Sequence, residues 1–332
     1  LRPLSRSIDR NFMRAKWAPD GATLVATAPD AGATGLWTFP MDGNPRRWTL
    51  GSIYTTGDLD VASDGRVVFV GRTSVRPDEL YIVTSPDREP VRLTDFQAGL
   101  DAVRFGKAET VHWTSDGMPF SGVVTYPPDF DPKRKYPLVL FIHGGPWFSS
   151  RVSFVERVQL LAAQGWIVFQ PNYRGSDNYG NVPYSAVYRD HGAGPGRDVM
   201  AGLEVLKSRG SVDASRIGIS GWSYGGYMTA WLIGHYPGWK AAIAGAAVLD
   251  LGENYALNDL NLYERAYGET LTMPADLALQ AEQSPITSVD AITTPLLLVA
   301  TTGDTRVPVT QTYRLFRALK ERNRDVRLLL YP

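Results

Sequence analysis

The chain has 332 residues, 44% of them hydrophobic and 20% charged, and its 34 basic and 34 acidic residues give a formal net charge of zero. This composition indicates a soluble globular protein that is long enough for two domains. The even charge balance disfavours nucleic acid as a partner, no apolar run is long enough to cross a membrane, and the absence of cysteine excludes disulfides and thiolate metal sites.

The first hundred residues repeat themselves. Residues 17–21 align with residues 61–65, and residues 36–37 align with residues 80–81 at the same offset of 44 positions. Each unit holds a D-G turn, an alternating strand, a looser loop and a second short strand. The alternating strands are expected at residues 24–28 and 67–70.

A repeat of this length, built from short strands, is typical of β-propeller blades. We therefore predict that residues 1–107 form part of a β-propeller, about two blades. Because a closed propeller needs about four to eight blades, further blades are expected before Leu1. The alternative is a pair of unrelated hairpins in a β-sandwich, which the constant offset disfavours.

From residue 108 onward the pattern changes to alternating strands and helices. A strand pair that ends near residue 126 comes first, and apolar strands separated by helices follow. This alternation predicts an α/β fold with a doubly wound, mainly parallel sheet that is covered on both faces. The strands are expected at residues 138–142, 166–170, 217–220, 241–246, 296–301 and 326–331, and the helices at residues 154–163, 198–207 and 311–320.

A serine lies on a sharp turn between the strand at 217–220 and a helix-like run at 227–233. The sequence of this turn is G-W-S-Y-G-G, over residues 221–226, and its serine is Ser223. The arrangement is that of a nucleophile elbow, in which glycines keep the strand and the helix from colliding with the serine. The G-x-S-x-G pattern alone is weak, and the flanking strand and helix make it specific. The alternative is a glycine-rich turn of an unrelated α/β protein.

An oxyanion hole for this nucleophile needs two N–H donors. The backbone N–H of Tyr224, directly after Ser223, is the first candidate. The second candidate is Gly145, in the loop after the strand at 138–142, where glycines let the backbone approach an oxyanion closely. His143 opens this loop, and we expect it to anchor the loop rather than to take part in the chemistry.

Asp304 is the candidate for the acid that orients the general base. It follows the strand at 296–301, at the carboxyl edge of the sheet where α/β folds place their sites. The alternative is an aspartate that caps a loop or a helix. In this kind of fold the triad runs Ser, Asp, His along the chain, yet no histidine follows Asp304. The histidines of the sequence are His112, His143, His191 and His235.

We therefore expect that residues 108–332 form an α/β-hydrolase catalytic domain that is truncated, at Pro332, before its catalytic histidine. The sequence contains no H-E-x-x-H pattern and no Walker loop, so no metal or other cofactor is expected. Residues 192–196 are rich in glycine but precede no suitable strand and helix, and we expect a loop there.

Four motifs occur in order along the chain. They are H-G-G-P at 143–146, N-Y-R-G-S-x-x-Y-G at 172–180, G-W-S-Y-G-G at 221–226 and G-D-x-R-V-P at 303–308. Together with the blade repeats they resemble the prolyl oligopeptidase family of serine peptidases, over essentially the whole chain. The H-G-G-P motif leans toward acylaminoacyl peptidases, whereas the elbow also matches dipeptidyl peptidases.

The resemblance implies hydrolysis of short peptides through a Ser-His-Asp acyl-enzyme mechanism, with the propeller restricting access. It also implies that Arg306 binds a carbonyl of the substrate. Val248, Leu251 and Val307 are implied to lie near the pocket for the residue before the scissile bond. The missing histidine is the departure from the family pattern.

The expected substrates are blocked or internal peptides. Capture of a free amino terminus requires converging carboxylates, and the blade segment holds only Glu79 and Glu89, which are not adjacent. Three alternatives stay open: a dipeptidyl peptidase, a hydrolase of small esters or amides, and a catalytically inactive binding protein if no histidine follows Pro332. A homo-oligomer is compatible with the sequence.

No secretory signal peptide is recognisable, and the sequence begins at Leu1 rather than at a methionine. We expect a soluble protein, with the cytoplasm slightly favoured. The compartment itself stays open, because the native N-terminus is not visible.

Overall fold

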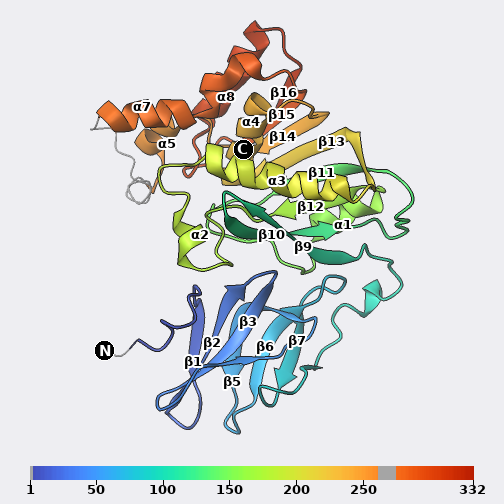
Figure 1. Cartoon of the computed structure of the whole chain (residues 1–332), viewed down its shortest axis with the longest axis vertical. Helices are drawn as coiled ribbons and strands as arrows, with labels where there is room; N and C mark the ends of the chain where they lie inside the picture. Colours follow the sequence, from blue (N-terminus) through green and yellow to red (C-terminus); the bar gives the residue numbers. More distant parts are fainter. Residues whose placement is uncertain (1–2, 261–273) are drawn as a thin grey trace.

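The computed structural model describes residues 3–260 and 274–332, and these residues form three β-sheets (Figure 1). The first hundred residues build two small sheets. Residues from 108 onward build a large sheet that carries most of the helices, and this sheet lies above the small sheets in the view of Figure 1.

Each small sheet is a meander of four antiparallel strands that are hydrogen-bonded in chain order. Gly21 and Gly65, with φ of 63° and 84°, lie in the D-G turns that the repeat predicts. The strands expected at 24–28 and 67–70 are confirmed as parts of β2 and β6. The first sheet consists of β1 (Arg14–Trp17), β2 (Thr23–Asp30), β3 (Ala33–Pro40) and β4 (Arg46–Trp48), and the second of β5 (Tyr54–Val61), β6 (Val67–Arg72), β7 (Glu79–Val83) and β8 (Val91–Arg92).

One apolar cluster joins the two small sheets. Side chains from the inner face of each sheet pack together, and the rings of Phe69 and Tyr81 stack with their centroids 5.9 Å apart. Because the cluster draws on both sheets, each one buries its apolar face against the other. The buried members are Val25, Leu36, Trp48, Leu50, Val67, Phe69, Tyr81 and Val83.

The large sheet is mixed, with the strand order β16-β15-β14-β13-β11-β12-β10-β9. Neighbours from β16 to β12 are parallel, and β10 and β9 extend the sheet antiparallel. The prediction of a mainly parallel α/β sheet is thus confirmed. Its strands are β9 (Ala108–Ser115), β10 (Met118–Thr125), β11 (Tyr136–Ile142), β12 (Ile167–Pro171), β13 (Val212–Trp222), β14 (Ala241–Gly245), β15 (Leu296–Thr301) and β16 (Val326–Tyr331).

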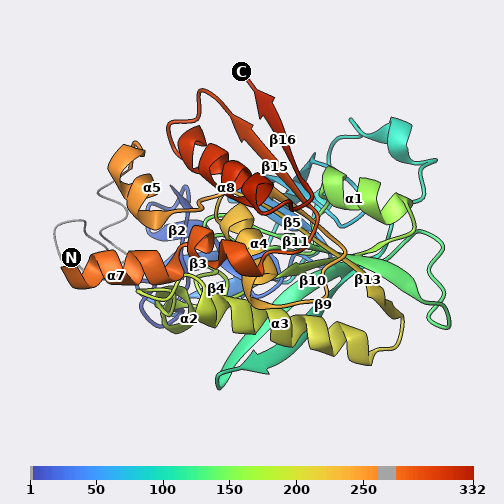
Figure 2. The ribbon, with the colours of Figure 1, turned by 90° about the horizontal axis from the view of Figure 1, so that it is seen from above.

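Helices separate the parallel strands, as the alternation predicts. The most buried of them is α4, which packs against β11, β13, β14 and α3 and lies between α3 and α8 when the molecule is seen from above (Figure 2). The helices are α1 (Glu156–Ala163), α2 (Asn181–Ser185), α3 (Ala193–Ser208), α4 (Tyr224–His235), α5 (Leu251–Leu257), α7 (Pro274–Gln283) and α8 (Val309–Glu321), with short 3₁₀ turns at Ala98–Leu100 and Pro285–Ala291.

The glycine-rich segment at 192–196 is not a loop, and this prediction was wrong. Helix α3 begins inside it, five residues before the helix expected at 198–207. A Cβ at Gly192 would lie 2.5 Å from the ring of Trp231, and a Cβ at Gly194 would lie 2.6 Å from the guanidinium of Arg174. The glycines therefore serve close packing of a helix, which outweighs their low intrinsic helix propensity.

The turn between β2 and β3 is hydrogen-bonded to loops that follow strands of the large sheet. The N–H of Ala31 donates to the carbonyl of Asn178 at 3.0 Å, and Asn178 Nδ2 donates back to the carbonyl of Ala31 at 2.7 Å. Next to them, the N–H of Val152 donates to the carbonyl of Gly32 at 3.0 Å. These bonds place the first small sheet against the loops at the carboxyl edge of the large sheet.

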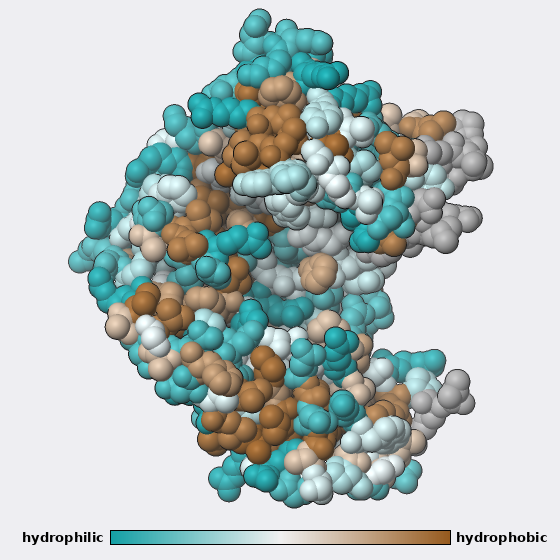
Figure 3. Space-filling model, turned by 180° about the vertical axis from the view of Figure 1, so that it is seen from behind, coloured by the Kyte–Doolittle hydropathy of each residue, from teal (hydrophilic) through white to brown (hydrophobic). Residues whose placement is uncertain are grey.

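Seen from behind, the surface is hollowed on one side between its upper and lower parts, and apolar groups gather on both parts (Figure 3). In the described ranges, no helix combines the length and the apolar character that crossing a bilayer requires.

Candidate active site

Ser223 lies between the end of β13 and the start of α4, where the sequence predicts it. Its φ of 59° and ψ of −122° place a non-glycine residue in a sparsely populated backbone conformation. The surroundings hold this conformation, because the N–H of Ser223 donates to the carbonyl of Gly245 and its own carbonyl accepts from the N–H of Tyr227, each at 2.9 Å. Strain of this kind is typical of a nucleophile elbow.

The glycines around Ser223 are required by the space around them. A Cβ at Gly221 would lie 2.2 Å from the carbonyl oxygen of Gly225, and a Cβ at Gly225 would lie 2.2 Å from that of Ile142. A Cβ at Gly226 would lie 2.5 Å from the carbonyl oxygen of Gly245. Since backbone atoms cannot swing aside, only glycine fits at these three positions.

Replacing Gly225 with alanine is expected to lower the free energy of unfolding by about 3 kcal/mol, the upper range for overpacking a core. Gly303→Ala is the matched control, because a Cβ at Gly303 meets nothing within 4 Å and its φ is not in the left-handed region. Urea unfolding of both variants measures the difference. Equal midpoints for the two would contradict the steric reading of the elbow.

A cleft of about 780 Å³ opens over Ser223. Its lining brings together seven of the eight residues that the sequence analysis assigned to the site: Ser223, Tyr224, Gly145, Arg306, Val307, Val248 and Leu251. These residues come from the loops after β11, β13, β14 and β15, so the carboxyl ends of the parallel strands meet here. Sequence reasoning missed Tyr227 and Trp222, which also line the cleft on either side of the serine.

Asp304 is not part of the cleft lining and lies in the turn between β15 and α8. Its Oδ1 accepts from the N–H groups of Arg306 and Val307, each at 2.9 Å, so it holds the turn that presents these two residues. Its Oδ2 has no hydrogen-bond partner within the described part of the chain. The capping role that the sequence analysis left as an alternative is therefore present, and it occupies one of the two oxygens.

The loop after β11 passes close to Ser223. A Cβ at Gly144 would lie 3.5 Å from Ser223 Cβ and 4.0 Å from its Oγ. Gly145 has a φ of 120°, which a side chain would disfavour, and a Cβ there would lie 2.4 Å from the backbone nitrogen of Trp147. Tyr224 is the first residue of α4, so its N–H is one of the groups that a helix leaves for acceptors outside it.

The N-Y-R-G-S motif supports this loop from behind, a role that sequence reasoning did not assign to it. Asn172 is fully buried, and its amide bonds both ways with the backbone of Ser150, at 2.6 and 3.0 Å. The hydroxyl of Tyr173 donates to the carbonyl of His143 at 2.6 Å. The motif letters were visible in the sequence, but their partners lie about twenty to thirty residues upstream along the chain.

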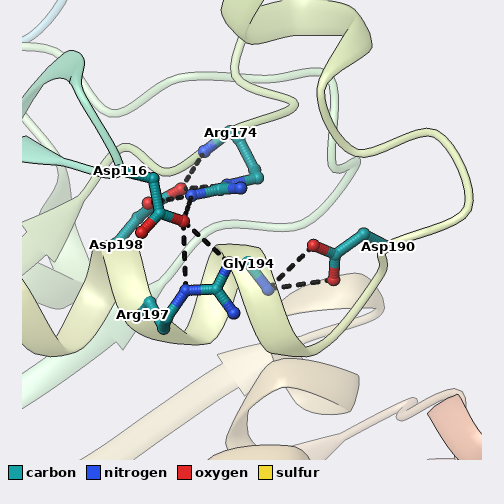
Figure 4. A network of polar contacts seen from close by, with 6 residues as sticks. All are labelled: Asp116, Arg174, Asp190, Gly194, Arg197 and Asp198. Carbon is teal, nitrogen blue, oxygen red and sulfur yellow. Dashed lines mark hydrogen bonds and ion pairs between the residues drawn. The ribbon is translucent and has the colours of Figure 1, made fainter.

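A buried ion pair fixes the motif to α3. Asp198 is fully buried and accepts three hydrogen bonds from Arg174, from its backbone N–H at 3.0 Å and from its guanidinium at 2.8 and 2.7 Å (Figure 4). Asp116 joins the same guanidinium at 2.6 Å and also pairs with Arg197. Hydrogen bonds from Arg197 and then from Arg174 lower the pKa of Asp116 to about 2.

Arg306 reaches the cleft while paired with Asp259. Its Nε donates to Asp259 Oδ1 at 2.6 Å and a terminal nitrogen donates to Oδ2 at 3.2 Å. This pair lowers the pKa of Asp259. Both side chains are about half exposed, so the pair orients the guanidinium without burying it.

None of the four histidines hydrogen-bonds to Ser223 within the described residues. His112 faces Ser121 across the β9–β10 pair, and His235 stacks on the ring of Trp231 at the far end of α4. His191 and His143 line the cleft. The ring nitrogens of His143 contact the carbonyl of Gly144 and the hydroxyls of Tyr173 and Ser176.

Comparison with known proteins finds the prolyl oligopeptidase family over residues 152–332. The chain is 31% identical to dipeptidyl-peptidase 5 of Porphyromonas gingivalis, over 98% of this chain and 49% of the relative. It is 28% identical to an uncharacterized peptidase of Bacillus subtilis, over 95% of this chain and 48% of the relative. The chain thus spans about half the length of the curated relatives it matches.

A solved structure, the acylaminoacyl peptidase of Pyrococcus horikoshii, matches 99% of this chain and 52% of its own, with a TM-score of 0.89 and 26% identity. The human acylamino-acid-releasing enzyme is 32% identical over 65% of this chain and 30% of its own length. The matched family segment contains Ser223, Asp304 and Arg306, and it covers more than half of the chain. The chain belongs to the prolyl oligopeptidase family.

Proposed function

We propose that this chain carries the nucleophile and acid of a serine peptidase that hydrolyses short peptides, with a preference of the acylaminoacyl type. The observation that carries the proposal is the strained backbone of Ser223 in the lining of a cleft that Tyr224 and Gly145 also line. Family membership supports the reaction class. The acylaminoacyl peptidase structure and the acylamino-acid-releasing enzyme among the relatives support the substrate class.

In the proposed reaction, Ser223 Oγ attacks the carbonyl carbon of the scissile bond and forms an acyl-enzyme that water then hydrolyses. The N–H groups of Tyr224 and Gly145 stabilise the oxyanion of each tetrahedral intermediate. A histidine serves as general base, and Asp304 offers Oδ2 to orient it. We assign this role to none of His112, His143, His191 and His235.

The acyl side of the substrate is proposed to lie against Val248, Leu251 and Val307. Leu251 and Val307 are buried and Val248 packs on the main core, so their positions are fixed by packing. An apolar wall of this kind fits an uncharged side chain before the scissile bond. Arg306 lies at the same end of the cleft, where its guanidinium can donate to a substrate carbonyl.

The charges of the cleft favour a blocked amino terminus. Its lining contains Arg151, Arg157 and Arg306 but no aspartate or glutamate among the described residues. Asp177 and Asp259 pair with Arg151 and Arg306, so these two carboxylates are already engaged by arginine. Glu79, one of the two glutamates among residues 1–107, has both carboxylate oxygens engaged by Thr94 and by the backbone at 96–97. A desolvated ammonium without a carboxylate partner is costly, so an acylated or internal peptide fits better.

The test compares N-acetylated and free-amine forms of one chromogenic peptide on the full-length protein. Faster turnover of the acetylated form is expected. A strong preference for the protonated free amine would favour a dipeptidyl peptidase, the class to which one 31% identical relative belongs. Turnover of esters without peptides, or no turnover at all, would favour the esterase and the inactive binding protein, respectively.

The division of the chain is also a proposal. Residues 1–107 are proposed to be about two blades of a β-propeller, and residues 108–332 an α/β-hydrolase domain. Two successive four-stranded meanders, related by an offset of 44 residues, support the first assignment. The strand order and the elbow support the second. The cytoplasm as compartment and a homo-oligomeric state stay predictions.

Replacing Arg306 with alanine is expected to weaken transition-state binding by about 1.5 to 3 kcal/mol, the range for a charge-assisted hydrogen bond. The free energy of unfolding should change by less than about 1 kcal/mol, because the pair with Asp259 is half exposed. Arg322→Ala, which removes an exposed pair with Asp290 at the other end of α8, is the control for kcat/KM. Unchanged kinetics with a large loss of stability would make Arg306 a structural residue instead.

A further inference from the structure

We infer that His143 is a positioning residue for the oxyanion hole. Its ring fixes the peptide plane between Gly144 and Gly145, and this plane aims the N–H of Gly145 into the cleft. The inference rests on the proposed function, since it names what sets the geometry of one oxyanion donor. It gives a role to the histidine of the H-G-G-P motif and to the N-Y-R-G-S motif, which contacts that histidine in the structure.

The contacts of the His143 ring define its tautomer. Nδ1 lies 2.8 Å from the carbonyl oxygen of Gly144 and 3.2 Å from the hydroxyl oxygen of Tyr173. A carbonyl only accepts, and the Tyr173 hydroxyl donates its proton to the carbonyl of His143, so Nδ1 carries the proton. Nε2 lies 3.1 Å from Ser176 Oγ and accepts from that hydroxyl. Burial lowers the pKa of His143 to about 4, so the ring stays neutral near neutral pH. The neutral tautomer with its proton on Nδ1 therefore fits all three contacts of the ring nitrogens.

The bond to Gly144 also fixes Gly145. The peptide between these residues is trans, so the N–H of Gly145 and the carbonyl of Gly144 point to opposite edges of one plane. Because His143 holds the carbonyl edge, the N–H edge faces away from the imidazole. Gly145 lines the cleft, and its N–H has no acceptor within the described residues.

The N-Y-R-G-S motif holds the His143 ring in place. It stacks on Tyr173 with the centroids 4.4 Å apart and the planes 11° from parallel. Tyr173 is fully buried, and its hydroxyl holds the carbonyl of His143 at 2.6 Å. Ser176 is 2% exposed, and its N–H donates to the carbonyl of Tyr173. A ring held on its face and at both nitrogens can fix a peptide plane.

Two variants of the full-length protein, whose new side chains are close to each other in size, test the inference. His143→Asn keeps a side-chain N–H near the position of Nδ1, whereas His143→Leu has a similar shape without a donor. We expect kcat to fall about 10²-fold in His143→Leu, as when an oxyanion donor is lost. We expect a loss of about tenfold or less in His143→Asn, and KM should stay within about threefold in both.

Two further readouts separate positioning from a merely structural role. Affinity for a peptide aldehyde, whose adduct with Ser223 places an oxyanion in the hole, should fall in step with kcat/KM. Long-range ¹H–¹⁵N spectra of the wild type should show His143 protonated on Nδ1 and neutral. If His143→Leu fails to fold, Ser176→Ala decides, with an expected loss in kcat of about three- to tenfold.

Equal losses in His143→Asn and His143→Leu, or a proton on Nε2, would overturn the inference. So would an unchanged aldehyde affinity in a folded His143→Leu protein, or an unchanged kcat in Ser176→Ala. The proposed function fails by a different result, which is a wild type without peptidase activity or a Ser223→Ala variant that retains it.

Discussion

Replacing Ser223 with alanine is expected to reduce peptide hydrolysis by the full-length protein by about 10⁴-fold or more. Without Oγ no acyl-enzyme forms, and only the oxyanion hole and substrate binding remain, which together sustain about 10³ to 10⁴ over the uncatalysed rate. Turnover of the acetylated chromogenic peptide measures the loss. The fold should persist, because the hydroxyl of Ser223 makes no hydrogen bond within the described residues and its backbone bonds are unaffected.

Ser153→Ala is the matched control, since Ser153 lines the same cleft. It should change turnover by no more than about threefold, as expected for a cleft residue outside the chemistry. A fluorophosphonate probe should label Ser223 in the wild type and no serine in Ser223→Ala. Labelling at another serine, or full activity in Ser223→Ala, would refute the assignment.

Removing the carboxylate of Asp198 is expected to cost about 3 to 5 kcal/mol of unfolding free energy, because it leaves the charge of Arg174 buried with one exposed partner, Asp116. Arg174 is 7% exposed in its side chain and Asp198 is fully buried. Chemical unfolding of Asp198→Ala measures the loss. Asp198→Asn keeps the shape and one acceptor oxygen, so it should fall between the wild type and alanine.

Glu204→Ala supplies the comparison on the same helix. Glu204 pairs with Lys207 at 2.7 Å, but its side chain is 62% exposed, so the pair should contribute less than about 0.5 kcal/mol. If Asp198→Ala were no more destabilising than Glu204→Ala, the network in Figure 4 would not hold the motif to α3 in the way that its geometry indicates.

The elbow could be predicted from sequence because its requirements are local. A serine turn between a strand and a helix needs glycines at fixed offsets, and the backbone clashes at Gly221, Gly225 and Gly226 are the physical form of that requirement. The strands followed from runs of apolar residues, since a parallel sheet that is buried on both faces tolerates few polar positions. Asp304 directly follows one of these apolar runs, so its place at the end of a strand could be predicted from sequence as well.

The sequence predictions failed, or were missing, where the local structure or the role of a residue depends on contacts with residues far away in the sequence. The segment at 192–196 has the composition of a loop. It is helical because its glycines pack closely against the ring of Trp231 and the guanidinium of Arg174. The tasks of Asn172 and Tyr173 depend on the loop after β11, which no local pattern connects to them. The arginines of the cleft wall were likewise beyond sequence reasoning, because Arg151 and Arg157 reach the cleft from chain positions far from the elbow.

The two hydrogen bonds between Ala31 and Asn178 restrict the exchange of the first hundred residues for those of a relative. Asn178 belongs to the segment 172–180, and Tyr173 of the same segment supports the loop that carries Gly145. This one segment therefore binds the β2–β3 turn and also supports the candidate oxyanion hole. A chimaera that takes its first hundred residues from a relative must reproduce this turn as well as the sheets. The first hundred residues and the large sheet are therefore not freely interchangeable with those of relatives, because the β2–β3 turn and the segment around Asn178 must fit each other.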